Sequence, residues 1–172
     1  LANNVHREYK KEFVKVGDEV LDKGDYSGPA GARLLLRDGR LQLAVLEVAR
    51  GGMLRRGLPV GHARVAVVTN VASDHLGQYG INTVADLAHV KLSVHRALLP
   101  GGQLVSNADD AQVVAAMPAM VRPVWFSLFP NSAQILAARA AAMPCGWYED
   151  GWLVLSDGAV TTRLIAARDV PL

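Results

Sequence analysis

The sequence predicts an α/β fold, built as a three-layer arrangement in which helices flank a mostly parallel sheet. Apolar runs of strand length alternate with segments of helical spacing between residues 41 and 142, which is typical of parallel strands joined by crossover helices. Residues 146–155 and 160–166 flank Ser156-Asp157-Gly158, which predicts an antiparallel hairpin at one edge of the sheet. A chain of 172 residues, 51% of them hydrophobic, can bury one full core, so we expect a single domain over residues 1–172.

The N-terminal part of the chain carries the weakest pattern. Residues 1–23 mix charged side chains with isolated valines, which suggest at most a short strand or a hairpin around Gly17 and Asp18. Residues 24–29 have the composition of a loop, whereas residues 30–37, with three consecutive leucines, predict a short helix.

The sheet is expected to begin with two nearly continuous apolar runs, at residues 41–48 and 63–69. Such runs are typical of parallel strands that are covered on both faces. Residues 83–99 predict the best-defined helix, because Thr83 and Asp86 form a capping-box pattern at its start and a Pro-Gly-Gly sequence follows its end. The elements expected after it are a strand at residues 103–106, a helix at 110–117, a strand at 121–128 and a helix at 132–142.

Composition and charge exclude several classes of protein. The 18 basic and 16 acidic side chains give a net charge of +2 and form no basic run, so nucleic acid is not an expected partner. No apolar run approaches the roughly 20 residues that span a bilayer, and the charged N-terminus does not resemble a signal peptide, so we expect a cytoplasmic protein without a membrane partner. The single Cys145 excludes an internal disulfide, and we interpret it as a buried or half-buried thiol rather than a catalytic one, because the segment around it offers no His or Asn partner.

Ligands of open α/β sheets bind at the carboxyl ends of the strands, where loops and helix N-termini present free N–H groups. A carboxylate and an imidazole at this edge, here Glu47 and His75, are able to hold Mg²⁺ together with water and phosphate oxygens. The alternatives are that Glu47 is an ion-paired surface carboxylate and that His75 is a turn histidine without a ligand. The polar residues expected at this edge are Glu47 from the first strand, Asn70 and His75 from the second, and Asn107, Asp109 and Asp110 from the third.

Two further residues have chemistry that suits this edge. Lys91 lies four positions after Leu87 and three before Val94, on the apolar side of its helix, and burial lowers the pKa of a lysine. A partly neutral amine reacts with carbon dioxide to give a carbamate, an anion that ligates metals; the alternative is a lysine that extends along its stem to solvent. Arg50, beside a Gly-Gly pair, would hold a carboxylate or a phosphate, unless the segment is only a flexible basic turn.

Four segments, taken together, resemble a known family. They are residues 47–58 (EVARGGMLRRGL), 67–81 (VVTNVASDHLGQYGI), 84–91 (VADLAHVK) and 106–110 (SNADD), and residues 24–29 (GDYSGP) precede them. In this order they resemble the central, ATP-binding domain of the Mur ligase family, and within it the cyanophycin-synthetase-like branch. The resemblance covers about residues 24–110 and implies the same α/β fold.

The resemblance implies an ATP-dependent ligase that joins an acid and an amino acid through an amide bond, by way of an acyl phosphate. Its cofactors would be ATP and Mg²⁺. Its partners would be a nucleotide and a carboxylate substrate. Glu47 and His75 match the Mg²⁺ ligands. Lys91 would be the carbamoylated lysine and Arg50 a second catalytic residue. The residues implied on the nucleotide side are Asn70, Asn107, Asp109 and Asp110.

The sequence also departs from that family. No Gly-x-x-x-x-Gly-Lys-Ser/Thr run occurs in the 172 residues, so the loop that cradles the phosphates of ATP is absent and the chain alone is not expected to turn over ATP. We therefore expect an incomplete central domain, without the family's C-terminal domain. Two other hypotheses are a non-catalytic α/β binding or interaction module and an unrelated nucleotide-binding α/β protein. Core surface left exposed in an incomplete domain would favour a homo-oligomer.

Overall fold

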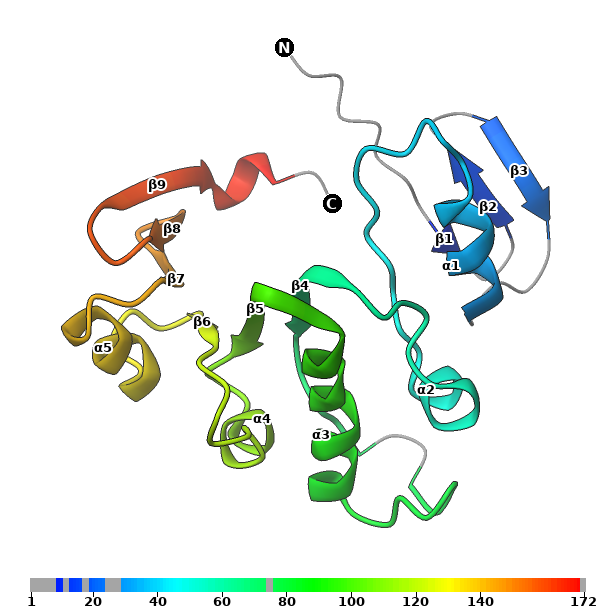
Figure 1. The fold of residues 1–172 in the computed structure, drawn as a ribbon. Coiled ribbons are helices and arrows are strands. Elements are labelled where there is room, and N and C mark those ends of the chain that lie inside the picture. The colour runs from blue at the N-terminus through cyan, green and yellow to red at the C-terminus, as the bar shows by residue number, and fades with distance from the viewer. Residues whose placement is uncertain (1–8, 11–12, 17–18, 24–28, 74–75, 171–172) are drawn as a thin grey trace. The chain divides into compact units, whose positions relative to one another are not determined.

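The computed structural model describes residues 9–10, 13–16, 19–23, 29–73 and 76–170 of the chain. The chain divides into two compact units, Leu1–His62 and Ala63–Leu172, and each is described by itself below (Figure 1). The single domain expected from the sequence stays a prediction.

The first unit contains a small antiparallel sheet. Its strands β1 (Tyr9–Lys10), β2 (Phe13–Val16) and β3 (Glu19–Lys23) pair in that order. The hairpin predicted from the isolated valines is therefore confirmed by the pairing of β2 with β3, although Gly17 and Asp18 themselves lie outside the described residues.

One helix of the first unit confirms the helix predicted at residues 30–37. The helix α1 spans Pro29–Leu36, and its Leu35 is fully buried. Partly buried apolar side chains from the same helix and from the segment after it pack against Leu35; they are Leu34, Ala44 and Leu46. Leu35 is thus the centre of a small local core.

The strand predicted at residues 41–48 is wrong, because the structure has no helix or strand over residues 38–49. Exposure does alternate along the segment as it would in a strand. Leu43 and Val45 are 69% and 71% exposed, whereas Ala44 and Leu46 pack against the local core. A strand forms only through hydrogen bonds to a neighbouring strand, and the described sheet of β1, β2 and β3 does not include this segment.

The Arg50-Gly51-Gly52 segment forms a helix, so its interpretation as a flexible basic turn is wrong. The helix α2 spans Arg50–Arg56, and the carbonyl oxygen of Ala49 accepts from the N–H groups of Gly52 at 3.0 Å and Met53 at 3.1 Å. The helix ends at Gly57, whose φ of 76° is a conformation that glycine adopts at little cost. The backbone of the glycine pair is therefore committed to the first turn of a helix.

The second unit is built on a six-stranded sheet that confirms the predicted α/β fold class (Figure 1). The strands lie side by side in chain order; the first four are parallel, and the last two continue the sheet in antiparallel fashion. They are β4 (Ala63–Val68), β5 (Leu98–Asn107), β6 (Val124–Ser127), β7 (Cys145–Glu149), β8 (Trp152–Ser156) and β9 (Thr161–Ala166). The mostly parallel sheet with an antiparallel edge is as the sequence predicts.

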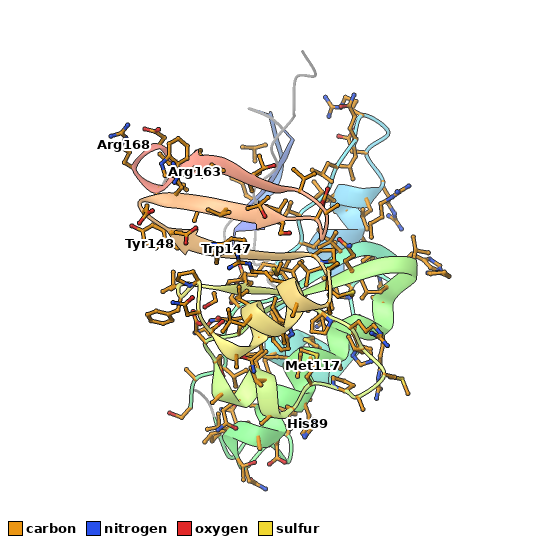
Figure 2. All side chains as sticks on the ribbon, turned by 90° about the vertical axis from the view of Figure 1, so that its left-hand side faces the viewer. His89, Met117, Trp147, Tyr148, Arg163 and Arg168 are labelled. Atoms are coloured by element: carbon orange, nitrogen blue, oxygen red, sulfur yellow. The ribbon has the colours of Figure 1, made fainter. Side chains whose placement is uncertain are left out.

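Three helices connect the parallel strands and cover one face of this sheet. They are α3 (Val84–Leu92), α4 (Ala111–Ala115) and α5 (Ala133–Ala140). Each joins two strands that are neighbours in both the chain and the sheet, and right-handed connections of this kind place all the helices on the same face. The two faces differ accordingly on β7, where Trp147 is 4% exposed and Tyr148 is 38% exposed (Figure 2).

The other face of the sheet carries exposed apolar side chains on β4. Val65 and Val67 are 52% and 56% exposed, whereas Val68 is buried. No helix of the second unit covers this face of β4 in the described structure, so the expectation that the strand is covered on both faces stays a prediction.

The helix predicted at residues 83–99 is shorter in the structure. The helix α3 ends at Leu92, a 3₁₀ helix spans Ser93–Ala97, and β5 begins directly after it. The predicted capping box is confirmed, since Thr83 Oγ1 accepts from Asp86 N and Asp86 Oδ2 accepts from Thr83 N, each at 3.0 Å.

The strand predicted at residues 146–155 is two strands, β7 and β8. They are joined at Asp150 and Gly151, whose φ angles of 50° and 82° suit a type I′ hairpin turn. The predicted hairpin around Asp157 and Gly158 joins β8 to β9 and is confirmed.

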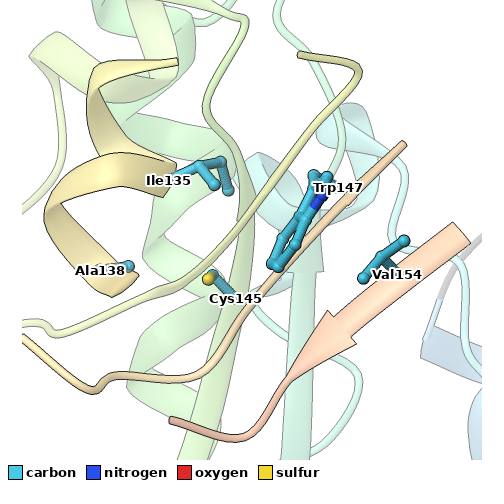
Figure 3. Close-up of a cluster of buried hydrophobic side chains, with 5 residues drawn as sticks. All are labelled: Ile135, Ala138, Cys145, Trp147 and Val154. Carbon is cyan, nitrogen blue, oxygen red and sulfur yellow. The ribbon is translucent and has the colours of Figure 1, made fainter. Parts of the chain in front are cut away.

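The core of the second unit includes a cluster between α5 and the last strands (Figure 3). Ile135 and Ala138 of α5 lie with Cys145 and Trp147 of β7 and Val154 of β8. Cys145 is fully buried and burial raises the pKa of its thiol, so the predicted buried thiol is confirmed. Within the described parts of the chain, no helix is long and apolar enough to cross a membrane.

Candidate functional site

The carboxyl ends of β4, β5 and β6 meet at one edge of the sheet, because these strands are parallel neighbours. The loop after β5 also stays attached to β6, since Ala108 N donates to Phe126 O at 2.8 Å. The structure therefore brings together four residues predicted at this edge, which are Asn70, Asn107, Asp109 and Asp110.

Lys91 of α3 reaches the end of β4. Its Nζ donates to the backbone oxygen of Asn70 at 3.2 Å, and the Thr69 hydroxyl donates to Asn70 Oδ1 at 3.1 Å. Lys91 is half-buried, and its amine bonds a backbone carbonyl. Whether Lys91 carries a carbamate or only extends along its stem toward solvent stays a prediction.

Asp110 caps α4 and also contacts the loop after β4. Its Oδ1 accepts from the N–H groups of Gln112 at 2.9 Å and Val113 at 3.1 Å, as an N-cap does. Its Oδ2 accepts from Val71 N at 2.6 Å, across a separation of 39 positions in the chain. Because Val71 is only 9% exposed, this bond supplies the partner that a buried N–H group requires.

Asp109 makes the corresponding contact with the loop after β6. Its Oδ1 accepts from the Ser127 hydroxyl at 2.5 Å, and its Oδ2 accepts from Leu128 N at 2.7 Å. Ser127 is 3% exposed, and its oxygen also accepts from Phe129 N at 2.8 Å. Sequence reasoning missed Ser127, whose one signal is a serine that closes the apolar strand β6.

The fold and the residues at its sheet edge agree with one protein family. Residues 24–142 match the family model of the Mur ligase middle domain. The chain belongs to this family. The resemblance that rests on residues 24–110 is thereby confirmed, and the matched range includes parts of both compact units.

This Mur ligase middle domain is similar to part of several proteins named cyanophycin synthetase. The protein of Trichormus variabilis is 39% identical over 158 residues, which are 91% of this chain and 18% of the relative. The protein of Crocosphaera subtropica is 38% identical over 161 residues, which are 92% of this chain and 18% of the relative. The protein of Synechocystis sp. is 37% identical over 163 residues, which are 94% of this chain and 19% of the relative. The chain thus spans about a fifth of the length of these curated relatives.

Two predicted site residues of the Mur ligase middle domain lie in the first unit. Glu47 is exposed in the segment without regular structure, and Arg50 is the first residue of α2. The strand that was expected to deliver Glu47 to the sheet edge is not formed, because its segment has no strand partner among the described residues. The roles of Glu47 and Arg50 stay predictions.

The magnesium site also stays a prediction. His75 lies outside the described residues. Among the residues that are described, no group of three or more His, Cys, Asp and Glu side chains could hold a metal ion. Two protein ligands such as Glu47 and His75 would leave the remaining positions to water and phosphate oxygens, which is common at Mg²⁺ sites.

Proposed function

We propose that the chain is part of an ATP-dependent ligase that joins an acid and an amino acid through an amide bond. The observation that carries the proposal is the gathering of amide and carboxylate groups at the carboxyl edge of β4, β5 and β6 in a Mur ligase middle domain. Similarity to proteins named cyanophycin synthetase supports the same reaction class. ATP, when bound, supplies the phosphoryl group that turns a carboxylate into an acyl phosphate, from which an amine displaces phosphate to form the amide.

Asn107 and Asn70 are the residues proposed to contact the nucleotide. A side-chain amide offers a donor and an acceptor side by side, which matches the polar edge of an adenine ring. Asn107 Oδ1 already accepts from Asp109 N at 2.8 Å, so its amide nitrogen is the group that we propose donates to the base. Asp109 and Asp110 lie in the same loop, on the nucleotide side.

Glu47 and His75 are proposed to hold Mg²⁺, whose charge would neutralise phosphate oxygens during transfer. Arg50 is proposed to bind a carboxylate or phosphate through its guanidinium group. Lys91 is proposed to become a carbamate: its unprotonated amine attacks carbon dioxide, a C–N bond forms as one C=O π bond opens to a carboxylate oxygen, and the proton on nitrogen passes to water. Its position beside Asn70 supports a role at this edge.

The alternative is a non-catalytic α/β binding or interaction module. The 172 residues contain no Gly-x-x-x-x-Gly-Lys-Ser/Thr run, which favours a chain that does not turn over ATP by itself.

The proposed partners are a nucleotide, a carboxylate substrate and a second copy of the chain. The exposed apolar Val65 and Val67 support self-association, since such surface tends to be covered by a partner.

Isothermal titration of the chain with ADP and ATP in the presence of Mg²⁺ tests the proposal. We expect the parent chain to bind, and Asn107→Ala to bind about tenfold more weakly because the base loses a hydrogen-bond partner. Gln103→Ala is the matched control, because it removes an amide four positions earlier on the same strand and should bind like the parent. Glu47→Ala and His75→Ala should lose the part of the affinity that depends on Mg²⁺.

Two outcomes would contradict the proposal. A parent chain that binds neither nucleotide would favour the interaction module. Equal affinity in Asn107→Ala and Gln103→Ala would place the nucleotide away from the carboxyl edge of β5.

A further inference from the structure

The peptide group between Asn70 and Val71 is held at both of its polar atoms. Its carbonyl oxygen accepts from Lys91 Nζ at 3.2 Å, and its N–H donates to Asp110 Oδ2 at 2.6 Å. Because a peptide group is planar, one bond on each side fixes its orientation. The loop after β4 is thereby attached to α3 through one atom and to the start of α4 through the other.

Both carboxylate oxygens of Asp110 are engaged by backbone donors. Oδ1 accepts from Gln112 and Val113 in the first turn of α4, and Oδ2 accepts from Val71. Hydrogen bonds to an ionised carboxylate are roughly twice as strong as those between neutral groups. One side chain therefore caps a helix and holds a loop that follows a different strand.

Asp109 is engaged in the same way on the opposite side. Its two oxygens accept from the Ser127 hydroxyl and from Leu128 N, and its own N–H donates to Asn107 Oδ1. Two adjacent carboxylates therefore attach the loop after β5 to the loops on either side of it. The four oxygens of this pair all face donors of the protein itself.

We infer that Asp109 and Asp110 are positioning residues that hold the three strand-end loops, and with them Asn70 and Asn107, rather than ligands of the nucleotide. What these loops bind rests on the proposed function, whereas the attachment of the loops does not. A site whose loops are fixed before the ligand arrives loses less conformational entropy on binding and so binds more tightly.

The variant Asp110→Asn separates the two interactions of this carboxylate, the cap on α4 and the hydrogen bond from Val71 N. Asparagine is as good an N-cap as aspartate, but its single acceptor oxygen cannot both cap α4 and accept from Val71 N. We expect amide hydrogen exchange at Val71, followed by NMR on the full chain, to accelerate by about tenfold or more. Asp157→Asn is the control. The N–H groups of Ala159 and Val160 both donate to the same oxygen of Asp157, Oδ1, and asparagine keeps that oxygen.

Ser127→Ala tests the second carboxylate. Loss of the hydroxyl removes one of the two bonds from the end of β6 and the loop after it to the Asp109 carboxylate, and also the bond from Phe129 N to the same hydroxyl, so exchange at Leu128 should accelerate. Ser156→Ala removes another buried serine hydroxyl, at the end of β8, and should leave exchange at Leu128 as it is in the parent.

Nucleotide binding then distinguishes positioning from mere support of the fold. We expect ADP to bind Asp110→Asn about tenfold more weakly than the parent under conditions in which both chains are fully folded, as urea unfolding curves of the two chains establish. Unchanged exchange at Val71 would overturn the inference, and so would unchanged ADP affinity in a variant whose Val71 exchange has accelerated. A parent chain that binds no nucleotide would instead contradict the proposed function, and the exchange rates would still decide whether the carboxylates hold the loops.

Discussion

Two glycines in the antiparallel part of the sheet have positive φ angles, Gly151 at 82° and Gly158 at 100°. Their surroundings differ. A Cβ atom on Gly151 would meet nothing within 4 Å, whereas a Cβ atom on Gly158 would overlap the backbone of Ala142. Gly158 is therefore required both by its backbone conformation and by the close approach of the segment that follows α5.

Gly158→Ala is expected to destabilise the second unit much more than Gly151→Ala. Each variant places a Cβ atom on a positive-φ backbone, at a cost of roughly 1 kcal/mol. Only Gly158→Ala must also displace the backbone of Ala142. Urea unfolding of the two variants measures the difference, and equal shifts of the midpoint would contradict the close packing of the β8–β9 hairpin.

The sequence predicts local contacts of single residues better than distant ones. The start of a helix at Asp110 can be predicted, because aspartate before an amphipathic segment is a common N-cap. The bond from Val71 to the same carboxylate cannot, because 39 positions separate the two residues and only the fold brings them together. Ser127 was missed for the same reason: its partner Asp109 lies on the neighbouring strand-end loop.

At the scale of the element, the first turn of α3 is capped by two hydrogen bonds, one in each direction, between Thr83 and Asp86. Hydrogen bonds from the side chain and the backbone of Thr83 lower the pKa of the Asp86 carboxyl. A carboxylate with a lowered folded-state pKa contributes stability that is present above its ordinary pKa and is lost as the pH falls through the folded-state value. The cap should therefore stabilise α3 at neutral pH more than in acid.

Thr83→Ala is expected to cost about 1 kcal/mol at pH 7, because the first turn of α3 loses its cap. The cost should shrink at a second, acidic pH that lies below the lowered folded-state pKa of Asp86, where the carboxyl is protonated and has less to gain from Thr83. Unfolding curves of the parent and Thr83→Ala at both pH values measure this, with the exposed Thr161→Ala as a control that should show no such dependence. A cost that does not change with pH would contradict the role of the Asp86 carboxylate.

The boundary of a helix or strand was predicted well where residues at that boundary carry a capping or turn signal. The capping box fixed the start of α3, but nothing in the apolar spacing marks its end at Leu92. Asp150-Gly151 is a strong type I′ turn signal, but it was overlooked when residues 146–155 were predicted to form one strand. Residues 41–48 have the composition and the alternation of a strand, and only the absence of a pairing neighbour in the described first unit keeps them from forming one.

At the scale of the whole molecule, the alternation of strands and helices predicts the parallel order of β4 to β7. Consecutive strands become neighbours because each is joined by a short helical crossover. The composition of β4 suits a strand buried on both faces, yet Val65 and Val67 are exposed, since composition does not reveal where the covering elements come from. The division of the chain into two compact units was not predicted either, because the length and composition of the chain suit one core and the Gly- and Arg-rich segment at residues 49–62 was interpreted as a connection inside one sheet.

The central claim is that the carboxyl edge of β4, β5 and β6 is the nucleotide side of a Mur ligase middle domain. The most direct test is an NMR titration of the chain with Mg²⁺ and ADP, following the backbone amides. We predict that the largest shifts fall on Asn70, Asn107 and Leu128, and that the β8–β9 turn at Asp157 does not shift. Shifts that fall outside the loops after these three strands, or no shifts at saturating ADP, would contradict the claim.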